Sequence, residues 1–447
     1  MQVAIIGGGW AGLAAAVTLA EQCIPVTLFE SAAQLGGRAR RVEMNGLALD
    51  NGQHILIGAY RETLRLLAQV GVAASTAYYA PPLTLQVEPR FHLQAARLPA
   101  PWHLGVGLLR SRGIPLRGKF AAVRFLAALK RTRFQVAPEL TVSALLTEQN
   151  QSTALNRYLW HPLCLAALNT PPHSASAQVF AYVLRDAFFG TYDDSRLLLP
   201  RVDLGRLFPD VAACYLTAHA GTLHLNRRIQ RIEVQAGTFA LYHDQGVENF
   251  SHVICAAPPF RVASLLGHLA PLQPAIEQID ALRYQPIYTI YLQYAESVRL
   301  SLPMLGLTQT LSQWVFDHGA LSNQPGLMAV VISAKGAHEA LSHAELTGKV
   351  ADELRQALGL PGPPQWAQVI AEKRATFACT PKLRRPPNRT PLPGLWLAGD
   401  YTAADYPATL EAAVRSGIAS ARLALNALGQ HERPPECGTS LFAGNPV

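Results

Sequence analysis

Apolar residues near the start of the chain form two short runs on either side of an Ala/Leu-rich stretch. Residues 2–6 and 25–29 have the length of buried parallel strands, and residues 13–20 between them have the composition of a helix. The turn into that helix has the spacing G-x-G-x-x-G, with Gly7, Gly9 and Gly12. Such glycines allow a tight turn, close approach of backbone to a pyrophosphate, and close packing of helix on strand. The pattern therefore predicts a dinucleotide-binding unit.

Similar patterns return along the rest of the chain. Helical spacing is found in residues 61–70 and 345–358, and residues 138–204 are mostly helical in pattern. Strand-like runs occupy residues 42–49, 221–225, 229–234, 253–256 and 395–400. Residues 286–294 alternate aliphatic and aromatic side chains. Together with the runs at 314–316 and 327–332, they predict an antiparallel sheet with an apolar floor.

The order of these elements predicts an α/β protein with a Rossmann-type nucleotide-binding domain. That domain is expected in three stretches, 1–75, 206–268 and 386–428. A helical, basic subdomain is expected over 76–205, and an inserted antiparallel-sheet domain for the substrate over 269–385. Residues 429–447 are rich in Pro, Gly and polar residues, which predicts a disordered tail.

Composition narrows the class of protein. Charged residues make up 15% of the 447 positions and hydrophobic residues 49%, which predicts an apolar cavity, an apolar face, or both. No run approaches 18 uninterrupted apolar residues, and the first strand begins at residue 2, so we expect neither a transmembrane helix nor a signal peptide. The six cysteines lie far apart without a C-x-x-C pair. They indicate a reducing, cytoplasmic compartment and predict no metal site.

The net charge of +8 comes from one segment, residues 89–138, which we call the basic segment. It contains no Asp or Glu but ten Lys and Arg residues, and the rest of the chain has 28 basic and 30 acidic residues. Within it, basic and apolar residues interleave at helical spacing, which predicts peripheral contact with an anionic membrane. The basic residues expected at that contact are Arg124, Lys130, Arg131 and Arg133. A solvated helix face and a surface for a partner protein remain alternatives, and no nucleic-acid motif accompanies the segment.

Residues 30–38 narrow the choice of nucleotide. Glu30 ends the second strand, where a carboxylate can accept hydrogen bonds from ribose hydroxyls. The motif LGGR follows at 35–38, and a second glycine pair before an arginine suits another approach to the same pyrophosphate. This extended motif resembles that of the flavin amine oxidase and phytoene desaturase superfamily. The resemblance implies that the nucleotide is FAD, bound by a Rossmann-type domain of the glutathione-reductase-like group.

A second part of this resemblance lies near the C-terminus. A strand ends in Gly399-Asp400, and an Ala-rich helix follows over 407–417. In the superfamily the aspartate contacts the ribityl and pyrophosphate part of FAD, and the helix N-terminus faces the pyrimidine edge of the flavin. The residues that the resemblance implies at FAD are Gly7, Gly9, Trp10, Ala11, Gly12, Glu30, Ser31, Gly36, Gly37, Arg38, Gly52, Gln53, His54, Ile229, Gly399, Asp400, Thr409, Leu410 and Ala412.

Four internal stretches carry a narrower resemblance. They are DNGQHILIGAY at 50–60, WHPLC at 160–164, LNTP at 168–171 and ASA at 175–177. These stretches resemble the hydroxysqualene dehydroxylases, flavoenzymes of bacterial hopanoid synthesis. The resemblance implies a C30 isoprenoid alcohol as lipid substrate, loss of its hydroxyl as water, and delivery of hydride by reduced flavin to give squalene. It also implies an electron donor and neighbouring pathway enzymes as partners.

Departure of the hydroxyl requires a proton donor, for which His54, Asp317 and Tyr288 are candidates. Other functions stay open at this point, because one fold serves several chemistries. A phytoene- or squalene-type desaturase would run the opposite type of redox reaction, and an amine oxidase would use the same cofactor. From a different class, a prenyl-lipid carrier resembling the Rab GDP-dissociation inhibitors would share the fold without FAD. The intact nucleotide motifs count against the carrier.

Overall fold

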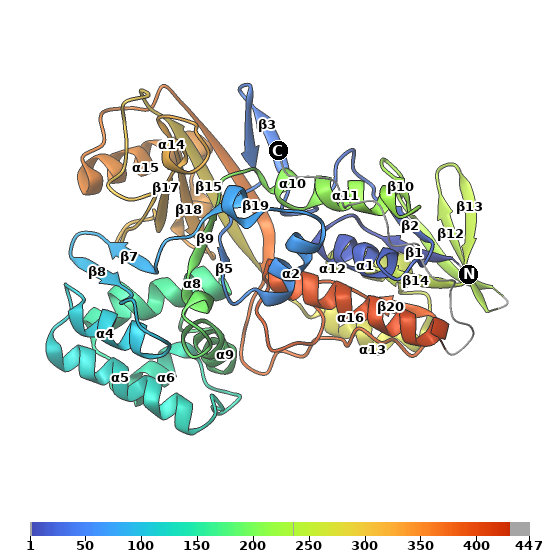
Figure 1. The fold of residues 1–447 in the computed structure, drawn as a ribbon, viewed down its shortest axis with the longest axis horizontal. Coiled ribbons are helices and arrows are strands. Elements are labelled where there is room, and N and C mark those ends of the chain that lie inside the picture. The colour runs from blue at the N-terminus through green and yellow to red at the C-terminus, as the bar shows by residue number, and fades with distance from the viewer. Residues whose placement is uncertain (1, 236, 430–447) are drawn as a thin grey trace, which may run out of the picture.

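The computed structural model describes residues 2–235 and 237–429. The tail predicted over 429–447 lies, apart from Gly429, outside these described residues. The larger of the described sheets are a five-stranded parallel sheet and a seven-stranded sheet. Figure 1 shows the parallel sheet in the right half of the view and the seven-stranded sheet in the left half, with a group of helices below it.

The parallel sheet has the strand order β10-β2-β1-β14-β20. Its strands are β10 (Thr222–His224), β2 (Val26–Phe29), β1 (Val3–Ile6), β14 (His252–Cys255) and β20 (Leu395–Leu397). Every residue of β1 and β2 is buried, as expected for strands covered on both faces. The strands come from the three stretches in which the sequence predicts nucleotide-binding elements. Because β2 and β14 flank β1 on opposite sides, the strand order reverses at β1. Open α/β sheets bind their ligands at such a point, outside the carboxyl ends of the strands.

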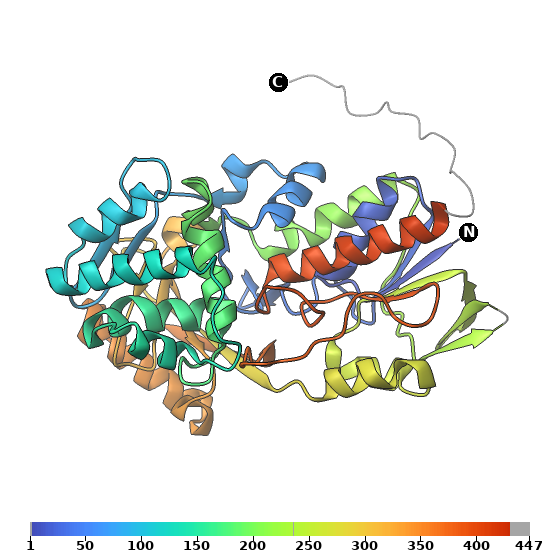
Figure 2. The same ribbon diagram turned by 90° about the horizontal axis from the view of Figure 1, so that it is seen from below.

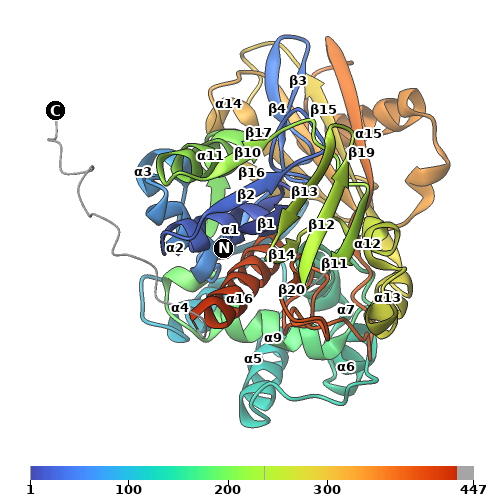
Figure 3. The ribbon, with the colours of Figure 1, turned by 90° about the vertical axis from the view of Figure 1, so that its right-hand side faces the viewer.

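Each face of the parallel sheet is covered by a different layer. Helices α1 (Trp10–Ala20), α11 (Pro209–Ala218) and α16 (Leu410–Gly429) share a core with one face. The other face packs on an antiparallel meander and two helices. These are β11 (Arg231–Gln235), β12 (Thr238–His243), β13 (Gly246–Phe250), α12 (Pro259–Leu266) and α13 (Gln273–Asp280). Figure 3 shows α1 and α16 on one side of the strands and the meander with α12 and α13 on the other.

The seven-stranded sheet has the order β19-β15-β18-β17-β16-β7-β8. Its strands are β19 (Trp366–Phe377), β15 (Tyr284–Gln293), β18 (Leu327–Ser333), β17 (Trp314–Asp317), β16 (Met304–Gly306), β7 (Thr84–Val87) and β8 (Phe91–Gln94). Neighbouring strands are antiparallel except β16 and β7, which pair in parallel. β19 was not predicted from the sequence, and the stretch that contains β7 and β8 was expected in a helical subdomain.

Side chains of β15 alternate between the two faces of this sheet. Tyr288, Ile290 and Leu292 pack with the buried face of α15 (His343–Leu358), which begins with a capping box at Ser342. Tyr291 faces the other way and belongs to the large core that also contains residues of the parallel sheet. The seven-stranded sheet therefore has one face for the helix α15 and one face toward the interior of the molecule.

The helices of residues 102–188 form a group at the end of the molecule away from the meander (Figures 1 and 2). They are α4 (Trp102–Arg110), α5 (Leu116–Arg131), α6 (Val142–Glu148), α7 (Thr153–Leu155), a π-helical turn (Asn156–Trp160), α8 (His161–Leu168) and α9 (Ala177–Phe188). Lys119 of α5 is buried, and its Nζ donates to the carbonyls of Leu109 (2.8 Å) and Ser111 (2.6 Å). This contact fixes the C-terminus of α4 to α5. Across residues 2–235 and 237–429, none of the helices combines the length and hydropathy that crossing a bilayer requires.

Shorter elements connect these layers. They are β5 (Leu56–Ile57), α2 (Arg61–Gln69), α3 (Ala74–Ala77), β6 (Tyr78–Tyr79), β9 (Leu197–Pro200), α10 (Leu204–Leu207) and α14 (His318–Leu321). The single strand predicted over 42–49 is instead a hairpin of β3 (Arg41–Met44) and β4 (Leu47–Asp50). Its turn is Asn45-Gly46, and both residues have positive φ, as a two-residue hairpin turn requires.

Candidate functional site

A cavity of about 1070 Å³ lies at the carboxyl ends of the parallel strands. It is lined by the residues that directly follow β1, β2, β14 and β20, and it extends to the inner face of the seven-stranded sheet at Ile287, Val331 and Ile370. The end near the parallel strands is rich in glycine and charged groups. The end at the seven-stranded sheet is mainly apolar. One cavity therefore joins a nucleotide-type site to an apolar compartment.

The turn after β1 has no room for a side chain at Gly7 or Gly12. Gly7 has a φ of +110°, and a Cβ on Gly12 would lie only 1.9 Å from the carbonyl oxygen of Gly7. Gly9 forms a β-bridge with Gly36, which brings the second glycine turn against the first. Helix α1 begins at Trp10 without a side-chain cap, so its first N–H groups are available to an anion in the cavity.

Glu30 is fixed by backbone at the end of β2. Its carboxylate accepts the N–H of Gly8 (2.7 Å) and the N–H of Ala32 (2.8 Å), and the side chain lines the cavity. The Ser31 hydroxyl also donates to it at 3.2 Å. A carboxylate has about four acceptor positions, so these three donors leave capacity for one further hydroxyl donor. This geometry suits the ribose of a dinucleotide, as the sequence motif predicts.

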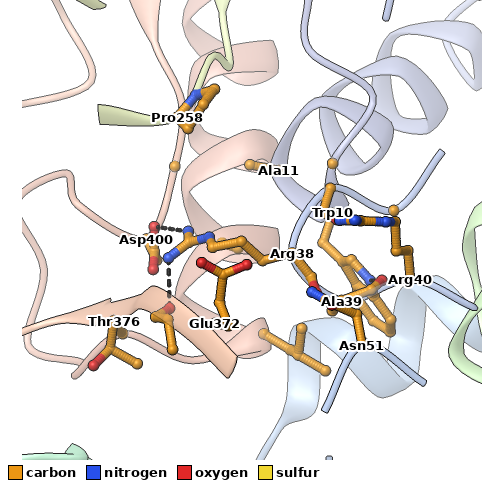
Figure 4. Close-up of a pocket in the computed structure, with 18 of the residues that line it drawn as sticks. Trp10, Ala11, Arg38, Ala39, Arg40, Asn51, Pro258, Glu372, Thr376 and Asp400 are labelled. Atoms are coloured by element: carbon orange, nitrogen blue, oxygen red, sulfur yellow. Dashed lines mark hydrogen bonds and ion pairs between the residues drawn. The ribbon is translucent and has the colours of Figure 1, made fainter. Parts of the chain in front are cut away.

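Arg38 joins the two ends of the chain across the cavity. Its Nη2 lies 2.7 Å from Oδ1 of Asp400, which follows β20, and its Nη1 donates to the carbonyl of Ala375 at 2.7 Å. The Asp400 side chain is almost fully buried, whereas that of Arg38 is 32% exposed. Figure 4 shows Arg38 reaching across to Asp400, with Glu372 close by. The pair therefore closes the polar end of the cavity.

Helix α16 begins directly at the cavity. Thr409 and Leu410 line it, and Oγ1 of Thr409 accepts the N–H of Ala412 at 3.1 Å. The positive end of the helix dipole is thus directed at the cavity, where it stabilises negative charge. Ala413 also lines the cavity, whereas the predicted Ala412 is buried beside it and does not. The helix lies close to α1 because Gly417 has no Cβ to meet the carbonyl oxygen of Ala11.

Glu411, in the first turn of α16, is fully buried. Its carboxylate accepts the N–H groups of Glu62 (3.2 Å) and Thr63 (2.9 Å) and the Thr63 hydroxyl (2.7 Å). It also pairs with Arg415 at 2.6 Å. One side chain therefore caps the N-terminus of α2 and holds it against the helix that lies at the cavity.

The loop 51–54 connects the polar end of the cavity to the seven-stranded sheet. Gly52, Gln53 and His54 line the cavity, and Gly52 has a φ of +102°. The N–H of Gln53 donates to Oγ1 of Thr289 at 3.3 Å, and the Tyr291 hydroxyl donates to the carbonyl of Asp50 at 3.1 Å. Two side chains of β15 therefore hold this loop in place.

Asp50, just before this loop, is buried, and burial raises its pKa from 3.8 to about 7. Between these values the folded chain holds a proton that the unfolded chain has released, so stability falls as pH rises. In the wild type, the Leu204 N–H donates to Oδ1 of Asp50 at 2.8 Å. In Asp50→Asn the amide oxygen can still accept this N–H, but the side chain no longer titrates. The free energy of unfolding of the variant, relative to that of the wild type, should therefore be higher at about pH 8 than at about pH 4 by more than about 1 kcal/mol. Urea unfolding at both pH values measures this, and an equal pH dependence would contradict it.

The apolar end of the cavity is formed by six elements, of which β15, β17 and β18 belong to the antiparallel sheet that the sequence predicts, whereas α8, α12 and β19 were not expected there. Its lining residues are Ala166, Ala167, Leu265, Ile287, Trp314, Phe316, Val331 and Ile370. The lining also includes four residues that were not predicted from the sequence and that Figure 4 shows around Arg38, namely Arg40, Asn51, Glu372 and Thr376. Ile370 and Glu372 line the cavity while Val369 packs on the side of α15, so this part of β19 is covered on both faces and has no period-two pattern that could have identified the strand.

Asn169, in the LNTP stretch, lines the same cavity and links three strands by hydrogen bonds of its side chain. Its amide donates to the Pro286 carbonyl (3.2 Å) and to Oγ1 of Thr376 (2.9 Å), and its oxygen accepts the Ala334 N–H (2.7 Å). The residue has a φ of +45°, a conformation that Asn tolerates. It thus fastens the end of α8 to the strands β15, β18 and β19.

Most residues predicted at the nucleotide line the cavity. These are Gly7, Gly9, Trp10, Ala11, Glu30, Ser31, Gly36, Gly37, Arg38, Gly52, Gln53, His54, Ile229, Gly399, Asp400, Thr409 and Leu410. Gly12 and Ala412 do not line it. Gly12 contributes indirectly, because its lack of a Cβ lets α1 pack closely against the turn at Gly7.

The three candidate proton donors lie in different places. His54 lines the cavity, and burial lowers its pKa. Asp317 caps α14, with its carboxylate accepting the N–H groups of Ala320 (3.2 Å) and Leu300 (3.0 Å), and it does not line the cavity. Tyr288 is on the opposite face of the sheet, with its ring against His338. Asp317 and Tyr288 are therefore not brought to the cavity.

Comparisons with known proteins agree with this geometry. The chain is 29% identical to a hydroxysqualene dehydroxylase of Zymomonas mobilis, over 94% of this chain and 98% of that protein. It is 24% identical to a 15-cis-phytoene desaturase of Narcissus pseudonarcissus, over 93% and 78% of the two chains. Cyclohexylamine oxidase from Brevibacterium oxydans has a similar fold, with a TM-score of 0.70, 18% identity, and coverage of 96% and 99%.

The family model for flavin containing amine oxidoreductases matches residues 10–425. FAD fits the described site, because the glycine turns leave space for a pyrophosphate, Glu30 has a free acceptor position, and two helix N-termini meet the cavity. The predicted cofactor, FAD, is thereby confirmed, and the chain is an oxidoreductase. It belongs to the flavin containing amine oxidoreductase family.

Proposed function

We propose that the chain converts hydroxysqualene to squalene by reductive dehydroxylation. The observation that carries the proposal is the similarity to hydroxysqualene dehydroxylases along almost the full length of both chains. The cavity supports it, because the FAD site continues into a compartment lined by residues such as Ile287, Trp314 and Phe316. Apolar walls suit a hydrocarbon chain, which binds by burial of surface.

The overall reaction breaks one C–O bond and forms one C–H bond. The hydroxyl takes a proton and leaves as water, and the carbon that carried it receives a hydride. FAD, when bound and reduced, supplies that hydride and is oxidised in the process. A separate two-electron donor must reduce the cofactor again, which makes such a donor a partner in the proposal.

The chain contributes position, exclusion of water and a proton. The apolar compartment keeps bulk water away from the carbon that loses its hydroxyl. His54 is the candidate donor of the proton, because it alone among the three candidates lines the cavity. Its lowered pKa makes its protonated form a stronger acid than an exposed histidine.

The test is a product assay on the purified, FAD-loaded protein with a chemical reductant. We expect hydroxysqualene to be consumed and squalene to appear, as detected by mass spectrometry. Formation of new double bonds in squalene or phytoene, without reaction of hydroxysqualene, would overturn the proposal in favour of a desaturase.

Removal of Arg38 should weaken the binding of FAD. In Arg38→Ala, the buried side chain of Asp400 loses the guanidinium that lies 2.7 Å away, its ion-pair partner at this end of the cavity. Because Arg38 is partly exposed, solvent screens part of the effect, and we expect a rise in the FAD dissociation constant of about tenfold. Fluorescence titration of the apoprotein measures it. Arg422→Ala, on the exposed side of α16, is the matched control, and equal affinities in the two variants would contradict the role of Arg38.

We further propose that the chain associates peripherally with the cytoplasmic face of an anionic membrane, through α4 and α5. Six of the eleven exposed large hydrophobic side chains among the described residues lie within positions 98–123. They are Leu98, Trp102, Leu109, Leu116, Phe120 and Val123. This concentration supports an interfacial surface, since such side chains are scattered singly on most soluble proteins.

Helix α5 has the pattern of a helix that lies in a membrane surface. Leu116, Phe120 and Val123 are spaced i, i+4 and i+7, and Phe120 is 63% exposed. Arg117, Arg124 and Arg131 recur every seven residues beside this stripe, and all three are exposed. Arginine side chains flanking an apolar stripe match the charge of anionic headgroups. Lys130 and Arg133 are exposed further along, with Nζ of Lys130 5.9 Å from the centre of the Phe189 ring.

Co-sedimentation with vesicles of phosphatidylglycerol and phosphatidylcholine tests the membrane proposal. Reversal of charge at Arg117, Arg124 and Arg131 to Glu should lower binding at least about tenfold, because each cation near the surface contributes about 1 kcal/mol. Phe120→Ser should also reduce binding. Val247→Ser, an exposed apolar residue of the meander, should leave it unchanged. Equal binding by the arginine variant and the wild type would overturn the proposal.

A further inference from the structure

His318 is a buried histidine to which no sequence motif pointed. It does not line the cavity itself but contacts Gln53, which does. It is the first residue of α14 and follows Asp317, whose carboxylate is occupied by two backbone amides. The Nε2 of His318 lies 2.9 Å from Oε1 of Gln53, and its Nδ1 lies 3.0 Å from Oγ of Ser322. Its ring also meets the edge of Tyr291.

The hydrogen bonds of Gln53 fix which atoms carry protons. The Nε2 of Gln53 donates to the carbonyl of His54 at 3.2 Å, so the amide oxygen is the atom that faces His318. An amide oxygen only accepts, and Nε2 of His318 must therefore carry the proton of this contact. Burial favours the neutral ring, as the lowered pKa of His318, about 4, also indicates.

The ring of His54 is fixed in the same way. Its Nδ1 lies 2.8 Å from the carbonyl oxygen of Gly52, which only accepts, so Nδ1 carries a proton. No residue within 2–235 or 237–429 is recorded as a hydrogen-bond partner of its Nε2. The neutral ring therefore has its lone pair on Nε2, and the protonated ring has a transferable proton there.

We propose that His318 is a positioning residue, which acts through Gln53 to hold His54 so that its Nε2 delivers the proton to the departing hydroxyl. The proton leaves Nε2, the C–O bond breaks, and water forms, with the hydride supplied as in the proposed function. The assignment of the proton's destination rests on that proposed function. The positioning of His54 by His318 does not depend on it.

Nitrogen NMR of the oxidised, FAD-loaded protein with labelled histidine tests the positioning directly. The His54 signal is identified by its absence in His54→Gln. We expect the wild-type ring to be protonated on Nδ1, the form that free histidine populates less. In His318→Leu the ring should shift toward protonation on Nε2, because Gln53 loses its partner. His318→Gln, which keeps a donor to Gln53, should retain the wild-type signal. An unchanged signal in His318→Leu would overturn the proposal.

Other variants guard against a fold defect and a merely structural role. Gln53→Leu breaks the same link from the other side and should cause the same shift if His318→Leu does not fold. His338→Leu removes a buried histidine on the opposite face of the sheet and should leave the His54 signal unchanged.

With hydroxysqualene, His318→Leu should lower kcat about tenfold or more at unchanged KM. A shifted ring with unchanged kcat would overturn the catalytic part. Absence of turnover in the wild type would overturn the proposed substrate and leave the NMR result standing.

Discussion

The Gly12→Ala variant is expected to purify without bound FAD and to lose about 3 kcal/mol of its free energy of unfolding. The added Cβ would lie 1.9 Å from the carbonyl oxygen of Gly7, which is backbone and has no rotamer to escape into. Helix α1 must therefore move away from β1, and the helix N-terminus moves away from the pyrophosphate with it. Flavin absorbance of the purified protein and urea unfolding measure the two effects.

A glycine in open space provides the matched control for this variant. Gly348 lies on the exposed side of α15, and a Cβ there would meet no atom within 4 Å. Gly348→Ala should stabilise the protein by about 0.5–1 kcal/mol, because alanine has the higher helix propensity. It should retain FAD. If Gly12→Ala behaves like Gly348→Ala, the close packing of α1 on the turn is not what the cofactor requires.

Glu411→Gln is expected to destabilise the protein by about 3 kcal/mol, the second largest effect. The carboxylate is fully buried and accepts from two N–H groups and a hydroxyl while it pairs with Arg415 at 2.6 Å. An amide presents its NH₂ group to one set of these donors, and the Arg415 charge loses its partner. Because Glu411 ties α2 to the start of α16, flavin binding should weaken as well. Thermal unfolding with and without added FAD measures both effects.

Glu345 offers the comparison for Glu411. It also accepts a backbone N–H and a hydroxyl, both from Ser342, but it is exposed at the start of α15. Water can replace a lost hydrogen bond there. Glu345→Gln should therefore lower the free energy of unfolding by only about 0.5–1 kcal/mol. Equal losses for the two variants would mean that burial of Glu411 has no special weight.

The nucleotide half of the site could be predicted from sequence because its signals are local. Gly7, Gly9 and Gly12 lie within one turn, and the LGGR motif and Gly399-Asp400 sit next to predicted strands. Gly7 and Gly12 meet steric demands of the fold that a side chain cannot satisfy, and Gly9 lines the cavity at the place where the motif expects the pyrophosphate. What the sequence could not give is the contact between Arg38 and Asp400, which joins residues 362 positions apart.

The apolar half was harder to predict, because its residues come from strands whose pairing is set by tertiary packing. The run Glu372-Lys373-Arg374 interrupts the apolar pattern of β19, and the strand was missed. Tyr288 was assigned to the cavity although strand geometry sends its neighbours, Ile287 and Thr289, to that face. An error of one position along a strand exchanges the two faces completely.

The basic segment was read correctly as exceptional in charge, but its residues are not equivalent. Lys119 is buried and binds the carbonyls at the end of α4. Arg117 and Arg124 lie beside the exposed stripe of α5. Helical spacing alone separates these two roles, since the buried and exposed positions alternate with the 3.6-residue period. The contact of this segment with lipid stays a prediction.

The measurement that tests the central claim most directly is an anaerobic single turnover. The bound flavin is first reduced chemically and freed of excess reductant, and hydroxysqualene is then added in a stopped-flow spectrometer. The account predicts that flavin absorbance returns and that squalene forms in a one-to-one ratio with reoxidised flavin. If the flavin stays reduced with hydroxysqualene, while squalene or phytoene bleaches the oxidised protein, the chain is a desaturase and the account is contradicted.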